Sequence, residues 1–136
     1  MFRVLPTLAL MLLVACSADQ PALSASDVHI PTPIPGATMG AAYLRLHNNS
    51  DEPININRVA SPQMKSVEMH ESVLVDGVAR MIKLPRVTIA PQESVVFERG
   101  AKHLMLRYPT ESPTQVTLQF FADDILLLSV DADFKE

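Results

Sequence analysis

The sequence is nearly free of cysteine: Cys16 is the single one in a chain of 136 residues. One cysteine excludes a disulfide within the chain. Cys16 also lies close to the N-terminus, ahead of the segment that has the pattern of a folded domain. We therefore expect the domain itself to contain no free thiol and no thiolate metal ligand.

The apolar run from Val4 to Val14 is too short to cross a bilayer as a helix, which needs about 20 residues. It is typical of the apolar region of a secretory signal. Leu13-Val14-Ala15-Cys16 resembles a bacterial lipobox, which implies cleavage before Cys16 and a diacylglycerol on its sulfur. We expect residues 1–15 to be a lipoprotein signal peptide and lipidated Cys16 to hold the protein on a membrane. The alternative is an ordinary secretory signal with an incidental cysteine.

Clusters of lysine and arginine are also missing from the sequence. The chain has 11 basic and 15 acidic residues, a formal net charge of −4 at pH 7. Proteins that bind a phosphate backbone need clustered positive charge. We therefore expect no nucleic-acid partner.

Helical periodicity is absent as well: no apolar pattern at i, i+3, i+4, i+7 persists far enough to predict a helix. Short stretches instead alternate between apolar and polar residues and are separated by proline and turn residues. In residues 42–47, for example, Ala42, Leu44 and Leu46 share one face of the predicted strand. The pattern predicts a single all-β domain, a sandwich or Greek-key barrel of about seven or eight strands.

We place this domain at residues 28–136 and join it to Cys16 by a flexible tether at residues 16–27, which are small and polar. The length of the chain leaves room for one domain of ordinary size. The expected strands are Val28–Ile30, Ala42–His47, Pro53–Ala60, a hairpin within Val67–Leu84, Ser94–Glu98, Leu104–Tyr108, Val116–Ala122 and Ile125–Ala132.

Asp76-Gly77 is a strong signal for a two-residue hairpin turn. Counting outward from this turn pairs Ser72 with Met81 and His70 with Lys83. His70 and Met81 are then diagonal neighbours on one face, with Cα atoms ~7–8 Å apart, which is within reach of two long side chains. We expect the opposite face to pack on the core; it carries Val67, Met69, Val73, Val75, Val78, Ile82 and Leu84.

His103 and Met105 are two residues apart on another predicted strand, so they share a face. Two imidazoles and two thioethers suit a soft cation of low charge, and Cu(I) fits better than zinc, calcium or magnesium. Each residue alone has a plainer explanation, because an exposed histidine or methionine is often solvated or incidental. We expect His29 and His47 to be such solvated residues.

The spacing of these four side chains resembles the signature of the periplasmic PCu(A)C copper chaperone family. The signature is a histidine, ten residues, a methionine, 21 residues and then His-x-Met, and His70, Met81, His103 and Met105 match it without a gap. The resemblance begins at Ile34. Its flanking matches are Pro35-Gly36-Ala37, Gly40-Ala41-Ala42-Tyr43-Leu44, Val67-Glu68-Met69-His70-Glu71, Asp76-Gly77-Val78-Ala79-Arg80-Met81 and Gly100.

The resemblance implies a cupredoxin-like β-fold that binds Cu(I) through His70, Met81, His103 and Met105. It also implies a periplasmic location and delivery of copper to the Cu(A) centre of a cytochrome c oxidase subunit, often beside a thioredoxin-like assembly factor. Departures from the family, such as Ala101 in place of a glycine, affect the surroundings of the site and not its ligands.

Two other functions are compatible with an all-β envelope protein. One is an interaction or structural lipoprotein that has the fold but transfers no metal. The other is a small zinc enzyme that uses His70 with Glu68 or Glu71. Because the sequence contains no H-E-x-x-H motif and no nucleophile elbow, we expect the protein not to be an enzyme.

Overall fold

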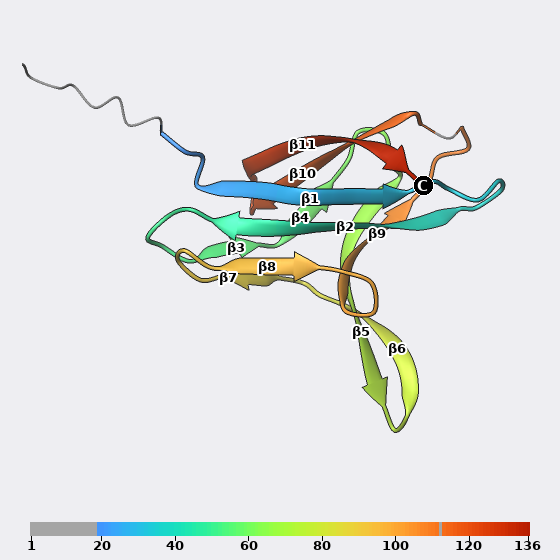
Figure 1. The fold of residues 1–136 in the computed structure, drawn as a ribbon, viewed down its shortest axis with the longest axis horizontal. Coiled ribbons are helices and arrows are strands. Elements are labelled where there is room, and N and C mark those ends of the chain that lie inside the picture. The colour runs from blue at the N-terminus through green and yellow to red at the C-terminus, as the bar shows by residue number, and fades with distance from the viewer. Residues whose placement is uncertain (1–18, 112) are drawn as a thin grey trace, which may run out of the picture.

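The computed structural model describes residues 19–111 and 113–136, which form a protein built of β-strands. The predicted signal peptide at residues 1–15, Cys16 and the first part of the tether lie outside these residues. Within them, there is no helix that could span a membrane. The all-β prediction is confirmed, and Figure 1 shows how the strands are arranged.

Eleven strands lie in the described part of the chain, more than the seven or eight expected. Their bounds are β1 Leu23–Pro31, β2 Met39–Asn48, β3 Ile54–Ile56, β4 Arg58–Ala60, β5 Ser66–Val75, β6 Val78–Lys83, β7 Val87–Ile89, β8 Ser94–Phe97, β9 Lys102–Arg107, β10 Gln115–Ala122 and β11 Ile125–Lys135.

Most of these strands belong to one long sheet with the order β4-β10-β11-β1-β2-β9-β5-β6, in which β8 pairs with the far part of β2. β3 and β7 form a separate two-stranded sheet. Neighbouring strands are antiparallel, except that β1 and β11 run parallel. The order matters for the site, because it places β9 and β5, which are far apart in the sequence, side by side.

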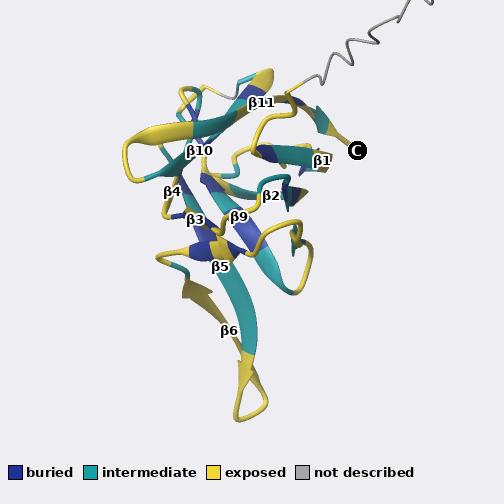
Figure 2. Ribbon diagram, turned by 90° about the vertical axis from the view of Figure 1, so that its left-hand side faces the viewer, coloured by how far each residue is buried: buried dark blue, intermediate teal, exposed yellow. Residues whose placement is uncertain are grey.

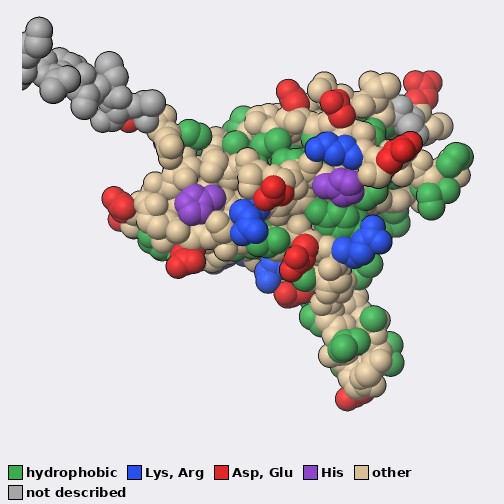
Figure 3. All heavy atoms as spheres, in the orientation of Figure 1, with side chains coloured by type: hydrophobic (Ala, Val, Ile, Leu, Met, Phe, Trp, Pro, Cys, Tyr) green, Lys and Arg blue, Asp and Glu red, His purple; other side chains and the backbone are tan. Residues whose placement is uncertain are grey.

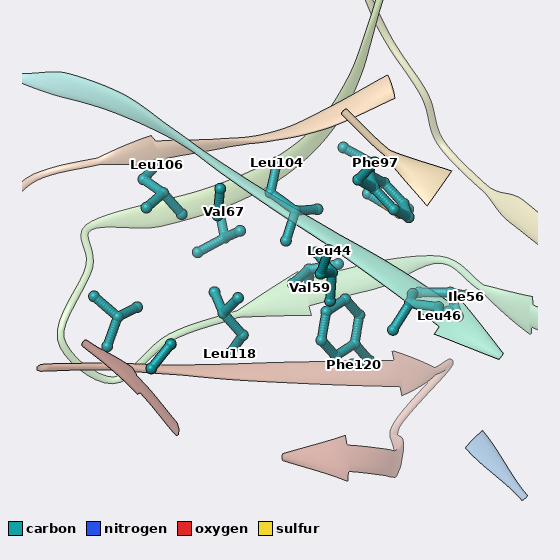
Figure 4. Packing of buried hydrophobic residues seen from close by; sticks show 14 of the residues in the cluster. Leu44, Leu46, Ile56, Val59, Val67, Phe97, Leu104, Leu106, Leu118 and Phe120 are labelled. Atoms are coloured by element: carbon teal, nitrogen blue, oxygen red, sulfur yellow. The ribbon is translucent and has the colours of Figure 1, made fainter. Parts of the chain in front are cut away.

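The core is formed by the apolar faces of alternating strands, as the pattern in β2 predicts. Ala42, Leu44 and Leu46 are at most 1% exposed. Burying each leucine contributes roughly 1.5–3 kcal/mol. Side chains of β2, β9 and β10 converge in the interior shown in Figure 4, namely Leu44, Leu46, Leu104, Leu106, Leu118 and Phe120.

β1 corrects the predicted domain boundary at Val28. The strand starts at Leu23, inside the expected tether, and Leu23 pairs with Asn48 on β2 and is 1% exposed. The residues between Leu23 and Val28 are too small and polar to show alternation, so their strand structure comes from hydrogen bonding to β2. A bulge near Asp27, whose φ is 54°, then shifts the register.

The expected strand Pro53–Ala60 is in fact two strands, β3 and β4, which belong to different sheets. β3 pairs with β7, a strand that was not predicted from the sequence. Both have three residues, too few for alternation to be recognised, yet Ile56 and Ile89 are completely buried.

The β5–β6 hairpin has the predicted register, with Ser72 opposite Met81 and His70 opposite Lys83. Asp76 and Gly77 have φ values of 52° and 76°, as a two-residue turn with two positive φ angles requires. The hairpin projects away from the body of the protein in Figure 1.

The prediction that one whole face of this hairpin packs on the core is wrong for its far half. Val67 and Met69 are buried, but Val75, Val78 and Ile82 are 39%, 56% and 47% exposed. The reason is that β9 pairs with β5 only as far as Glu71, so the rest of the hairpin extends beyond its neighbouring strand. In Figure 2 the turn and β6 are coloured as exposed, whereas β5 is coloured intermediate until close to the turn, and hydrophobic side chains appear along the hairpin in Figure 3.

Asn48 is a fully buried polar residue that ties β2 to the loops around it. Its Nδ2 donates hydrogen bonds to the carbonyl oxygens of Glu52 and Ile89, at 2.7 and 3.0 Å, and its Oδ1 accepts from Ser50 N at 2.9 Å. Replacing it would leave buried backbone groups without partners.

We expect Asn48→Ala to lower the free energy of unfolding by about 2–3 kcal/mol, because one buried and several partly buried hydrogen bonds are lost at once. Urea unfolding followed by circular dichroism measures this. The control is Asn49→Ala, since Asn49 is only half-buried and its side chain bonds Pro21 O and Ser24 Oγ. Equal losses for the two variants would contradict this role of Asn48.

Candidate metal centre

The four predicted ligands lie on one face of three neighbouring strands, β9, β5 and β6. His70 on β5 is directly opposite His103 on β9. Met105 is opposite Glu68, and Met81 on β6 is opposite Ser72. Since directly opposed residues share a face of a sheet, both methionines are diagonal neighbours of His70. The fold thus brings together side chains from positions 70 to 105.

One nitrogen of His70 is held by Glu68. The side chain of His70 is 13% exposed, and its Nε2 lies 2.9 Å from Glu68 Oε2. An ionised carboxylate can only accept a hydrogen bond, so Nε2 of the neutral ring carries the hydrogen and Nδ1 has the free lone pair. Nδ1 is buried and has no hydrogen-bond partner among the described residues.

Glu68 is kept ionised by its neighbours. Lys83 Nζ donates a hydrogen bond to Glu68 Oε1 at 2.8 Å, and this bond, followed by the one from His70, lowers the pKa of Glu68 from 4.5 to about 2. The carboxylate therefore remains an acceptor for His70 at any pH near neutrality. It fixes the ring in the orientation that leaves Nδ1 free.

His103 has the opposite arrangement of its two nitrogens. It is 5% exposed, and Nδ1 donates to the carbonyl oxygen of Ala101 at 3.1 Å. Nε2 is buried and unpartnered within the described part of the chain. The centroids of the His70 and His103 rings are 6.0 Å apart.

These two unpartnered nitrogens are the most informative feature of the site. A buried polar atom without a partner costs about 1–3 kcal/mol. Here His70 and His103 each present such an atom as a lone pair, and they are a directly opposed pair. A metal cation that accepts both lone pairs would remove the cost, so this arrangement fits a bound metal.

The two methionines differ in exposure. Met105 is half-buried in the sheet, whereas Met81 is 61% exposed at the start of the projecting part of the hairpin. In residues 19–111 and 113–136, no three histidine, cysteine, aspartate or glutamate side chains are grouped so that they could hold a metal. A metal at His70 and His103 would therefore depend on the sulfurs. Met69 is 4% exposed and lies in the core, as predicted.

The other two histidines lie outside this cluster. His29 is half-buried and stacks on Tyr43 with ring centroids 6.4 Å apart, and His47 Nδ1 lies 2.7 Å from Ser94 Oγ. Both have partners of their own on the polar face of the sheet, so they are less solvated than expected.

From the sequence, Glu68 was expected to have a role only in a zinc enzyme, and neither its contact with His70 nor the contribution of Lys83 was predicted. Strand alternation contained the signal, since residues 68 and 70 share a face and the hairpin register sets Lys83 opposite His70.

A family model described as "Putative lipoprotein LpqE-like" matches residues 23–124. No curated protein sequence matches the chain.

Several solved structures share the fold. The copper-bound PCuAC domain from PmoF2 is 19% identical, with a TM-score of 0.63 over 84% of this chain and 92% of that domain. The apo PCuAC domain from PmoF1 is 18% identical, with the same score over 84% and 93%. Apo-DR1885 from Deinococcus radiodurans is 24% identical, with a TM-score of 0.62 over 100% and 97%.

Proposed function

Because the chain belongs to the LpqE-like family and folds like PCuAC domains, we propose that it is an extracytoplasmic copper chaperone. The observation that carries the proposal is the opposed pair His70 and His103, each with one buried, unpartnered nitrogen. Met81 and Met105 are diagonal neighbours of His70 and would complete a set of two nitrogens and two sulfurs. One relative with the same fold is solved with copper bound.

The donor set favours Cu(I) over other metals. Thioether sulfur selects Cu(I), and imidazole is an acceptable partner, whereas calcium and magnesium require clustered oxygens. All four donors are uncharged, so the bound ion keeps its positive charge. The ionised carboxylate of Glu68, hydrogen-bonded to His70, offsets part of this charge.

The difference in exposure between the ligands suggests how the ion leaves. His70 and His103 are fixed by their second nitrogens, and Met105 is half-buried. Met81 is the most exposed of the four, so an acceptor's ligand would replace its sulfur first. Exchange of one neutral donor for another needs no oxidation and no proton transfer, which suits a carrier. We infer no enzymatic activity.

The acceptor and the location are part of the proposal. The family description supports an envelope lipoprotein. We propose that it is anchored through Cys16 on the periplasmic side of a membrane. The acceptor we propose is the Cu(A) site of a cytochrome c oxidase subunit, which a thioredoxin-like assembly factor also serves. The alternative is an envelope interaction lipoprotein without metal transfer, which the exposed hydrophobic residues of the hairpin favour.

A titration under anaerobic conditions distinguishes these functions. Cu(I) is added to the protein in the presence of the chromophoric chelator bicinchoninate, which reports free Cu(I). A chaperone withholds one Cu(I) per chain from the chelator and later releases it to a stronger thiolate ligand. A protein that leaves all the Cu(I) with bicinchoninate at every ratio is the interaction lipoprotein instead.

Glu68→Gln is expected to weaken Cu(I) binding by about 10- to 100-fold, the usual effect of removing a residue that orients a metal ligand. The glutamine amide can donate as well as accept a hydrogen bond, so it no longer selects the tautomer of His70 in which Nε2 carries the hydrogen. The competition titration measures the change. Glu71→Gln is the control, because Glu71 bonds Lys102 at 3.0 Å and touches neither histidine through a hydrogen bond. Equal affinities for the two variants would show that Glu68 does not orient His70.

The lowered pKa of Glu68 also predicts how the stability of the metal-free protein depends on pH. The pKa is lower in the folded chain than its usual 4.5, so the charge of Glu68 stabilises the fold above pH 4.5. This contribution is lost as the pH falls toward 2. It is small, because Glu68 and Lys83 are partly exposed. Urea midpoints between pH 5 and 2.5 should fall less steeply for Glu68→Gln than for the parent.

A further inference from the structure

Met39, the first residue of β2, shares the face of the sheet that carries the candidate centre. It pairs with Arg107 on β9, and Ala41 pairs with Met105. Residues two apart on a strand lie on one face, so Met39 and Met105 are diagonal neighbours across the β2–β9 boundary. β9 thus lies between β5, which carries His70, and β2, which carries Met39.

The distance between these two positions suits a shared ion. Diagonal neighbours in a sheet have Cα atoms ~7–8 Å apart, and long side chains from such positions can meet. Ala41, directly opposite Met105, has only a methyl group and leaves room on that side of the Met105 thioether. Methionine is unbranched and flexible, which lets its sulfur adjust to a metal.

Met39 is accessible at the surface of the protein. The residue is 45% exposed, so packing does not account for a long thioether side chain there. It lines a cavity of about 550 Å³, together with Lys65, Arg107 and Tyr108. The two positive side chains oppose long residence of a cation in this hollow. A copper ion there would therefore be held more weakly than between the two histidines.

We propose that Met39 is a transient fifth ligand, which takes Cu(I) from Met105, or hands it to Met105, at the edge of the centre opposite Met81. The step exchanges one thioether for another: the Met39 sulfur donates a lone pair to Cu(I) as the Met105 sulfur leaves, or the reverse. Copper remains Cu(I) and no proton moves. This inference rests on the proposed function and adds a second route for the ion.

Stopped-flow transfer of Cu(I) from the loaded protein to excess bicinchoninate tests the proposal. Met39→Leu keeps the size of the side chain and removes the sulfur. We expect its transfer rate to fall about tenfold, which corresponds to about 1.4 kcal/mol of barrier. Its equilibrium affinity should stay within about twofold of the parent. Met64→Leu is the matched control, since Met64 is 8% exposed in the core, and it should transfer at the parent rate.

Three results would overturn the proposal. If the parent holds Cu(I) but Met39→Leu transfers it at the parent rate, Met39 has no role and the proposed function is unaffected. If Met39→Leu loses affinity as strongly as Met105→Leu, Met39 is a permanent ligand. If the parent retains no Cu(I), the proposed function fails and this inference fails with it.

Discussion

His103→Ala is expected to lower the affinity for Cu(I) by more than about 100-fold, beyond the loss caused by removing a residue that only supports a ligand. His103 is the most buried of the four candidate ligands, and its Nε2 has no hydrogen-bond partner in the described residues. No nearby histidine can replace it, because His29 and His47 lie outside the cluster and have partners of their own. The measurement is competition against bicinchoninate.

The matched control for this variant is His47→Ala, which removes a half-buried histidine bonded to Ser94 and should bind Cu(I) like the parent. Loss of binding through misfolding is checked by urea unfolding of both metal-free variants. His103→Ala leaves a small cavity, which lowers the free energy of unfolding, but it also removes a buried nitrogen without a partner, which raises it. The two effects on stability therefore partly offset each other. Undiminished affinity in His103→Ala would mean that the centre is elsewhere.

Gly40→Ala is expected to destabilise the protein by about 3 kcal/mol, at the upper end of the cost of overpacking a core. Gly40 pairs with Leu106 on β9 and faces the interior. A Cβ atom on Gly40 would overlap the hydroxyl of Tyr108, whose side chain is 4% exposed. Burial also raises the pKa of Tyr108. The tyrosine would have to leave its place under β2 and disturb the pairing that holds Met105.

Gly36→Ala separates this clash from the strain of a positive φ angle. Gly36 has a φ of 82° and open space around its missing Cβ, so its replacement should cost only the backbone strain of roughly 1–2 kcal/mol. A double-mutant cycle completes the test, since the cost of Gly40→Ala should shrink in a Tyr108→Ala background. Equal costs in both backgrounds would contradict the clash.

Part of the site was predictable from the sequence because it depends on local rules. Alternation in a strand separates Met69, which lies in the core, from His70, which lies on the opposite face of the sheet. The Asp76-Gly77 turn fixes the hairpin register and sets Met81 diagonally to His70. Both conclusions depend on residues less than 15 positions apart. At such separations, hydrogen bonding and turn geometry allow few alternative strand registers.

The rest of the site depends on contacts between distant segments. Nothing local indicates that β9 pairs with β5, so the direct opposition of His70 and His103 required the structure. The same holds for the exposure of Met81, because the hairpin pattern does not show where the neighbouring strand ends. β1 is a further example: Leu23 pairs with Asn48 of β2 and is buried in the core, and nothing local in the sequence indicates either.

X-ray absorption at the copper edge of the Cu(I)-loaded protein tests whether His70, Met81, His103 and Met105 bind one Cu(I) together. We expect two nitrogen and two sulfur neighbours, with one sulfur lost in Met105→Leu and one nitrogen lost in His103→Ala. Met64→Leu should leave the spectrum unchanged. A first shell without sulfur, or one that is the same in the parent, Met105→Leu and His103→Ala, would contradict joint binding by these four residues.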